Sequence, residues 1–450
     1  MENIEKIRIG KNFLGLLNDL KRRPEDAATE LGLPLDYILD IIKGKKELSS
    51  DIIKKATEVW PINHRDFFII RDDCYNGVRI MRRDESEKSS RIMSRAGYPY
   101  YEYRDTAMSC VGPFRPEWIK ELCIVGDNEP TNQDVQWNNG HFMHQFTYFI
   151  GDVNFYYIGH DGEKKVAVMR TGDSNYITPF TPHSFATRKG SSTNGLILAL
   201  TYGNNLMGDA QQELSALGNE LGPEFVLDFS STEKAIASLL YFHLKNSSVG
   251  IEELSTRTAI SVTKIKNFLD ASSTPSHNEL KSIAKALDIN LRDLFPYDEI
   301  NARVIIQKYE NAKHWFYPDF SKSYEMIELA STVNLPYSKA LEINILNNNG
   351  VDLDLKVGLH QYGYNVGKSD VQLNWKTNDN NFSEFIRPGD SFYIKPFVNH
   401  SFRGKGKLLV LRIGGKIAGE SQLELSLIGK ENVERAINET MQWFDPEGKN

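Results

Sequence analysis

The sequence of 450 residues has few of the features that mark a secreted, disulfide-rich or membrane-bound protein. Its three cysteines include no CxxC pair, which excludes a thiolate metal cage and fits a reducing compartment. The first 23 residues are amphipathic and interrupted by charge, so they predict neither a signal peptide nor a membrane span. The net charge of −7 argues against DNA or an anionic membrane as the main partner. We therefore expect a cytoplasmic globular protein of more than one domain.

What the chain does contain is a second copy of itself. The segment INHRDFF at 62–68 returns as INLRDLF at 289–295, and HQFTYFIG at 144–151 returns as HQYGYNVG at 360–367. GDSNYITPFTPHSFATRKG at 172–190 returns as GDSFYIKPFVNHSFRGKG at 389–406. The offsets of 227, 216 and 217 residues are nearly constant and the order is kept, so the sequence predicts a duplicated two-part unit.

The first part of each unit is helical and the second is β. Apolar residues at three-to-four spacing, broken by glycine and proline, predict short helices of helix-turn-helix type, with Ser261 and Ser276 as N-caps. Short β-branched and aromatic runs between turn residues predict a jelly-roll barrel. The expected fold class is α+β. Its expected domains are helical at 1–85, barrel at 86–225, helical at 226–305 and barrel at 306–450.

Two short motifs in the first barrel carry candidate metal ligands. Barrels of this kind resemble the cupins, whose first motif holds two histidines and an acid and whose second runs from Gly-Asp through a proline to a final histidine. Here the first motif reads Asn139-x-His141-x3-Gln145, and the second ends at His183. Residues i and i+4 of a strand share a face, so we expect His141 and Gln145 to point into the barrel and His144 outward. With His183 they would form one face of a metal site and leave the other face open.

The alternative is that both histidines are hydrogen-bonded residues of the barrel interior. The duplication favours a metal, because the second copy keeps Gln361 and His400 but has Val357 opposite His141. One complete and one incomplete set indicate an active first barrel and a second barrel that is structural, which we expect to be metal-free.

Tandem helical and cupin parts are similar to the family of 2-hydroxyethylphosphonate dioxygenases and methylphosphonate synthases, which are non-haem iron oxygenases. The resemblance covers nearly the whole chain, and its specific motifs lie at 95–105 and 139–185. In the dioxygenases a ligating glutamate stands six residues before the second-motif histidine, where this chain has Ile177. Gln145 and Ile177 match the synthase branch. The resemblance implies Fe(II), 2-hydroxyethylphosphonate and O2, with methylphosphonate and carbon dioxide or bicarbonate as products and no 2-oxoglutarate. Hydroxymethylphosphonate and formate are the alternative products.

The resemblance also implies residues that hold the phosphonate. Arg95 and Tyr103, eight apart, match an arginine–tyrosine pair of the family, and Arg91 with Tyr98 is the competing pair. Asn138 matches a substrate-binding asparagine, and Asn139 is its neighbour and competitor. Tyr103 is also a candidate catalytic residue.

Lys21, in the basic segment at 21–23, matches a lysine with which the family's helical domain reaches a barrel, often that of another subunit. It is therefore a candidate for both substrate binding and catalysis. A homo-oligomer, a dimer or tetramer, would follow from such an arrangement. A solvated helix end is the alternative for this lysine.

Two other classes of function stay open on the sequence. A helix-turn-helix joined to a cupin also describes small-molecule-responsive transcription factors. The candidate recognition helices, however, carry few of the Arg, Lys, Asn and Gln side chains that read DNA bases. A zinc- or manganese-dependent cupin isomerase is the third reading, because the ligand types alone do not choose the metal.

Overall fold

The chain divides into two compact units. The computed structural model describes residues 2–203, 206–296, 303–346, 353, 355–377, 380–438 and 442–444. The first unit holds Met1–Val78, Ser109–Pro113 and Gly414–Asn450, and the second holds Arg79–Met108 and Phe114–Ile413. None of the described helices has the length and apolar character needed to cross a membrane. The division into four domains stays a prediction.

The first unit begins with short helices joined by tight turns. These are α1 (Glu2–Leu20), α2 (Pro24–Leu31), α3 (Leu35–Ile42), α4 (Ser50–Val59) and the 3-10 helix η1 (His64–Phe67). Gly32 ends α2 in the left-handed conformation, and the Ser49 hydroxyl caps α4 by accepting a hydrogen bond from the Ile52 amide. The apolar faces meet in one core around Phe13 and Trp60. Propensity and capping therefore agree with packing in this part.

The segment that follows the second barrel belongs to this same unit. It contains α11 (Glu420–Ile428), η5 (Lys430–Asn432) and α12 (Val433–Ile437). Gln442 Nε2 donates to the Arg22 carbonyl at 2.7 Å, and Lys11 Nζ donates to Asn438 Oδ1 at 3.2 Å. Side-chain hydrogen bonds thus join this segment to the N-terminal helical part.

The second helical part repeats the first. It contains α6 (Asp209–Leu221), η2 (Gly222–Phe225), α7 (Thr232–Asn246), α8 (Ile251–Thr258), α9 (Val262–Leu269), α10 (His277–Leu287) and η3 (Leu291–Leu294). Both predicted N-caps are confirmed: the Ser261 hydroxyl accepts from the Lys264 amide and the Ser276 hydroxyl from the Glu279 amide. η1 and η3, which carry the first repeated segment, share the same Asn–Asp capping box.

The first barrel consists of two packed sheets. A seven-stranded sheet has the order β12-β9-β6-β11-β4-β3-β2, and a four-stranded sheet has the order β5-β10-β7-β8. Phe149 of the larger sheet packs on Phe155 and Phe185 of the smaller one. The strands are β2 (Arg91–Arg95), β3 (Tyr98–Asp105), β4 (Glu117–Glu121), β5 (Ile124–Val125), β6 (His144–Ile150), β7 (Val153–Ile158), β8 (Lys164–Met169), β9 (Ser174–Ile177), β10 (His183–Arg188), β11 (Leu196–Tyr202) and β12 (Val304–Gln307).

The second barrel repeats this arrangement. Its sheets have the orders β1-β19-β16-β21-β15-β14-β13 and β18-β17-β20. The strands are β1 (Val78–Met81), β13 (His314–Tyr317), β14 (Tyr324–Glu328), β15 (Ser338–Ile345), β16 (His360–Asn365), β17 (Val371–Thr377), β18 (Asn380–Ile386), β19 (Ser391–Ile394), β20 (Asn399–Gly404) and β21 (Gly406–Ile413). The short helices α5 (Arg83–Lys88) and η4 (Tyr309–Asn311) complete the elements.

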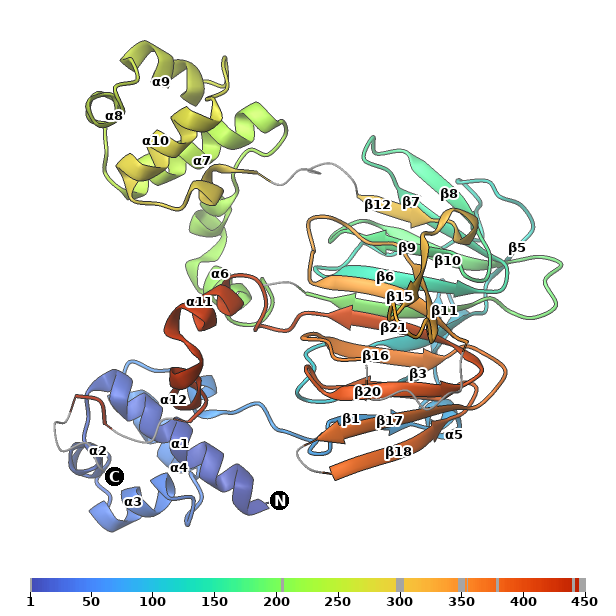
Figure 1. The fold of residues 1–450 in the computed structure, drawn as a ribbon, viewed down its shortest axis with the longest axis horizontal. Helices are drawn as coiled ribbons and strands as arrows, with labels where there is room; N and C mark the ends of the chain where they lie inside the picture. The colour runs from blue at the N-terminus through green and yellow to red at the C-terminus, as the bar shows by residue number, and fades with distance from the viewer. Residues whose placement is uncertain are drawn as a thin grey trace. The chain divides into compact units, whose positions relative to one another are not determined.

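The two barrels exchange a strand. β12, which precedes the second barrel in the chain, pairs with β9 of the first (Figure 1). β1, which precedes the first barrel, is the neighbour of β19 in the second. The buried carboxylate of Glu342 also joins them, accepting hydrogen bonds from the Tyr148 hydroxyl at 2.6 Å and from Lys407 Nζ at 2.7 Å. Each seven-stranded sheet therefore contains a strand from the other half of the duplication.

Candidate metal centre

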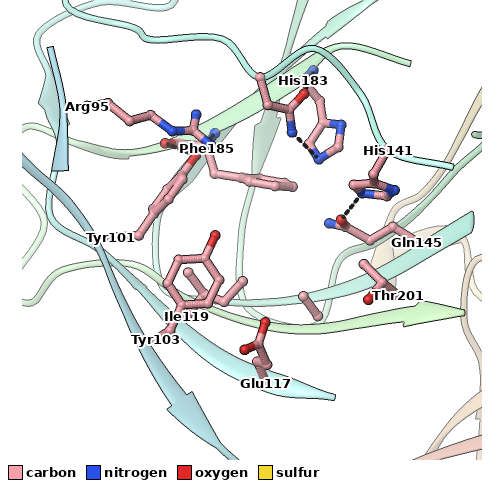
Figure 2. Close-up of a pocket in the computed structure, with 12 residues that line it drawn as sticks. Arg95, Tyr101, Tyr103, Glu117, Ile119, His141, Gln145, His183, Phe185 and Thr201 are labelled. Carbon is pink, nitrogen blue, oxygen red and sulfur yellow. Dashed lines mark hydrogen bonds between the residues drawn. The ribbon is translucent and has the colours of Figure 1, made fainter. Parts of the chain in front are cut away.

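The first barrel encloses a cavity of about 120 Å³. Figure 2 shows His141, Gln145 and His183 on one side of it, with Tyr103 and Glu117 across from them. The residues predicted from the sequence that line this cavity are Arg95, Tyr103, Asn138, His141, Gln145 and His183. The fold thus brings together side chains from residues that span almost ninety positions of the sequence.

Both histidine rings are held by backbone carbonyls at Nδ1. His141 Nδ1 lies 2.8 Å from the Met143 oxygen, and His183 Nδ1 lies 2.8 Å from the Thr181 oxygen. Because a carbonyl only accepts, each Nδ1 carries the hydrogen, and in the neutral ring Nε2 presents a lone pair. Burial lowers the pKa of His183 to about 4, which keeps that ring neutral at physiological pH. This is the tautomer that an Nε2 metal ligand requires.

The Gln145 amide presents its oxygen to the same point. Its Nε2 donates to Thr147 Oγ1 at 2.9 Å, and this bond turns Oε1 toward His141 Nε2 at 3.0 Å. In a neutral His141 ring with its hydrogen on Nδ1, neither of these two atoms can donate to the other, so both lone pairs are available to a cation between them. In an octahedral ion with ligand distances of about 2.1 Å, adjacent ligand atoms are about 3.0 Å apart. The residues present therefore fit a divalent metal ion.

The amide is essential to this interpretation. Among the described residues, no group of three or more His, Cys, Asp and Glu side chains could hold a metal ion. Two imidazoles and one amide oxygen thus form the candidate set, with the ring centroids of His141 and His183 5.3 Å apart. Such a set carries no negative charge, so a bound cation would keep its full attraction for an anionic substrate.

The expected strand across both first-motif ligands is wrong. β6 begins only at His144, and Gly140, with φ of 73°, turns the chain immediately before His141. His141 therefore reaches the cavity from a loop, and strand alternation does not explain why it shares a face with Gln145. His144 does point away from the cavity: its Nδ1 lies 2.6 Å from the Tyr176 hydroxyl. Burial lowers the pKa of His144 to about 4.

The cavity contains one of the two competing arginine–tyrosine pairs. Arg95 lies over the rings of Tyr100 and Tyr101 and donates to the Gln136 carbonyl at 2.7 Å. Burial raises the pKa of Tyr103 to about 12, so its hydroxyl stays protonated.

The competing pair lies outside the cavity lining. Arg91 is exposed and forms ion pairs with Asp105 at 2.7 Å and Glu117 at 2.9 Å. Tyr98 is 75% exposed. Geometry therefore favours Arg95 and Tyr103, whose role in binding stays a prediction.

The structure also separates the two asparagines. Asn138 lines the cavity, and its Nδ2 lies 3.0 Å from His183 Nε2. Its Oδ1 accepts the His183 amide at 2.9 Å, so this side chain both touches and positions a candidate ligand. Asn139 is not among the residues that line the cavity.

The other two predicted residues lie elsewhere. Ile177 is fully buried in β9 and pairs in register with Gln145, so it supports the amide from the neighbouring strand. Lys21 belongs to the other compact unit, where its Nζ donates to the Asp19 carbonyl at 2.9 Å and lies 5.6 Å from the centre of the Trp443 ring. Its role stays a prediction.

Comparison with known proteins identifies the family. No family model matches the sequence. The chain is 57% identical over 444 residues to the methylphosphonate synthase of Nitrosopumilus maritimus, across 99% of this chain and 97% of that protein. The chain belongs to the methylphosphonate synthase family. It is also 22% identical to the 2-hydroxyethylphosphonate dioxygenase of Streptomyces viridochromogenes, over 91% of this chain and 92% of that protein.

Solved structures confirm the predicted fold for this member of the family. The Streptomyces albus 2-hydroxyethylphosphonate dioxygenase, solved with substrate and Fe(II) bound, superposes with a TM-score of 0.92 at 34% identity. The match covers 99% of this chain and all of that one. A cadmium complex of PhpD with hydroxyethylphosphonate gives a TM-score of 0.75 at 19% identity, covering 95% and 99%, which extends the likeness of fold.

Sequence reasoning missed three polar residues that line the cavity, Tyr101, Glu117 and Thr201. It also missed Glu121, which lies on the same face of β4 as Glu117. Burial raises the pKa of Glu117. Glu121 is fully buried, both of its carboxylate oxygens lack a partner among the described residues, and burial raises its pKa well above the usual range. The alternation of Glu117, Ile119 and Glu121 was the available signal, since an inward-facing acid on a barrel strand is costly without a role.

Proposed function

We propose that this protein is a non-haem Fe(II) oxygenase that uses O2 to cleave the carbon–carbon bond of 2-hydroxyethylphosphonate. The products are methylphosphonate and either carbon dioxide plus water or bicarbonate plus a proton, and no 2-oxoglutarate is consumed. One O2 balances this reaction. The observation that carries the proposal is the convergence of His141, Gln145 and His183 on one cavity of the first barrel, with His141 Nε2 3.0 Å from Gln145 Oε1. Membership of the methylphosphonate synthase family supports it.

His141, Gln145 and His183 would hold the iron. When bound, Fe(II) supplies the one-electron chemistry by which O2 reacts with a closed-shell organic molecule. The carbonyl oxygens of Met143 and Thr181 fix the two imidazole rings, and the Thr147 hydroxyl fixes the amide, so little reorganisation accompanies metal binding. Because the three ligands are neutral, the anionic substrate supplies the charge that a carboxylate ligand would otherwise provide.

The opposite wall suits the phosphonate group. Arg95 provides a cation whose terminal nitrogens match two phosphonate oxygens, and its stacking on two tyrosine rings restricts its motion. Tyr103 keeps its proton and can donate a hydrogen bond to a third oxygen. On the histidine side of the cavity, Asn138 stands beside His183 and can donate to the same group. A cavity of about 120 Å³ admits a substrate of a few heavy atoms and excludes bulk water.

The second candidate gives hydroxymethylphosphonate and formate from the same substrate and O2. Likeness to the dioxygenase of Streptomyces albus, at 34% identity, favours it. Identity of 57% to a methylphosphonate synthase and the isoleucine at 177 favour the first. Phosphorus NMR of an aerobic reaction with Fe(II) and 2-hydroxyethylphosphonate decides. A methylphosphonate signal supports the proposal, hydroxymethylphosphonate supports the second candidate, and unchanged substrate refutes both.

We also propose that the protein acts in the cytoplasm as a homo-oligomer in which Lys21 serves the cavity of a neighbouring subunit. Mixing two inactive variants, Lys21→Ala and His183→Ala, tests this directly. If the lysine acts across subunits, mixed oligomers contain intact sites and activity returns after mixing. Activity that stays absent after subunit exchange, or a monomer by light scattering, refutes the arrangement.

A further inference from the structure

The second barrel has a partly buried cation in the place of the candidate metal site. Strand register identifies equivalent residues: Thr201 of β11 lies opposite Gln145 in the first barrel, and Arg412 of β21 lies opposite Gln361 in the second. The His141 carbonyl accepts a hydrogen bond from the Phe180 amide, and the Val357 carbonyl accepts one from the Phe397 amide. Val357 therefore takes the place of His141. A guanidinium therefore stands where the first barrel has a hydroxyl.

Among the described residues, no carboxylate forms an ion pair with this guanidinium. Burial lowers the pKa of Arg412 to about 10, although the side chain keeps some exposure to solvent. By register, the positions of Glu117 and Glu121 in the first barrel are Leu341 and Ile345 in the second. An unpaired charge in such surroundings is costly, so a buried cation normally has an anionic partner.

Two further buried groups point to the kind of anion. Gln361 Oε1 accepts from Arg412 Nε at 3.1 Å, which leaves the Gln361 Nε2 donor without a partner among the described residues. His400 is fully buried, and its Nδ1 lies 2.9 Å from the Val398 oxygen, so Nδ1 carries the hydrogen and Nε2 keeps an unpartnered lone pair. Arg412 lies near enough for its charge to lower the pKa of His400 further below the value set by burial.

We propose that the second barrel binds bicarbonate, or another planar oxyanion that carries one hydroxyl group. The two terminal nitrogens of Arg412 would donate to two anion oxygens, and Gln361 Nε2 would donate to one of them. The anion's own hydroxyl would donate to the lone pair of His400 Nε2. A carboxylate or nitrate would satisfy the donors but leave this histidine unpaired. The site does not depend on the chemistry proposed for the first barrel.

Thermal unfolding of the metal-free protein tests the site. Sodium bicarbonate should raise the Tm by roughly a few degrees at concentrations well above the Kd, and chloride and nitrate at equal ionic strength and pH should raise it less. Arg412→Met should abolish the difference. Lys405→Gln, an exposed cation in the same hairpin, and Arg95→Met, in the other barrel, should keep it.

Other outcomes overturn the proposal. Loss of the bicarbonate effect in Arg95→Met places the anion in the first barrel, and equal effects of the three anions remove the requirement for a hydroxyl. If Arg412→Met does not fold, His400→Phe replaces it. That variant should bind nitrate and bicarbonate equally, and a preserved preference for bicarbonate refutes the role of the histidine.

Discussion

Replacing Thr147 with valine should weaken iron binding without touching a metal ligand. Thr147 is fully buried, and its hydroxyl is the acceptor that holds Gln145 Nε2 at 2.9 Å. Valine keeps the shape of threonine and removes only the oxygen. In the variant, an amide that turns its oxygen to the metal leaves its N–H buried and unpaired. The opposite orientation lets that N–H bond to His141 Nε2 and blocks the metal.

The magnitude follows from the cost of the unpaired donor. A buried donor without a partner costs about 1–3 kcal/mol, which corresponds to a loss in iron affinity of roughly 5- to 150-fold. Residues that orient metal ligands typically contribute about 10- to 100-fold, so the two estimates agree. The free energy of unfolding of the metal-free protein should change less, because without metal the amide can take the second orientation.

Anaerobic titration with Fe(II) against a competing chelator measures the affinity. Thr147→Ser is the matched control, because serine keeps the hydroxyl and should bind iron within a few-fold of the wild type. Circular dichroism and thermal unfolding establish that both variants fold. Equal iron affinities of the valine and serine variants would refute the argument that the hydroxyl directs the amide oxygen to the metal.

Three further changes test other parts of the structure. Arg95→Lys should raise KM for 2-hydroxyethylphosphonate roughly 10- to 100-fold through lost charge-assisted hydrogen bonds, while Arg91→Lys should leave it near the wild-type value; equal effects in oxygen-consumption assays would contradict the assignment. Burial lowers the folded pKa of His360 to about 4, below the ordinary 6.5. The part of the free energy of unfolding that depends on a neutral His360 is therefore fully present above pH 6.5. It is lost as the pH falls toward 4, and about 2 kcal/mol is lost at pH 5. Urea unfolding at pH 7 and pH 5 should show a smaller loss of the free energy of unfolding in His360→Phe than in the wild type. An equal loss in both would show that His360 does not cause it. Glu342→Ala should lower the free energy of unfolding by about 3–5 kcal/mol because it leaves Lys407 and a buried tyrosine hydroxyl without their acceptor; a loss below about 1 kcal/mol in urea would show that the network is not stabilising.

The sequence by itself determined the elements and their repetition. Helix caps such as Ser261 and Ser276 bond to an amide only three residues away, so they can be predicted from the local sequence. The repeated Gly-Asp segments begin at Gly172 and Gly389, both with positive φ, because the same turn is built twice. The candidate ligands could also be named, since the spacing of Gln145 and His183 is a property of the motif.

The tertiary structure decided what the sequence left open. Arg91 and Arg95 stand four apart on β2, where regular alternation would give both the same direction, and the irregularity between Met93 and Ser94 breaks that alternation. Asn138 and Asn139 lie outside any strand, so no strand period gives the direction of their side chains. The loop position of His141 depends on the turn at Gly140 and on packing against a distant segment.

The strand exchange and the position of Arg412 depend on contacts between residues far apart in the chain. Local propensity carries no information about such contacts, because their free energy arises only when both partners are buried together. Sequence pattern thus determined which side chains were available. Only the packed barrels decided which of them face one another and which stay unpaired.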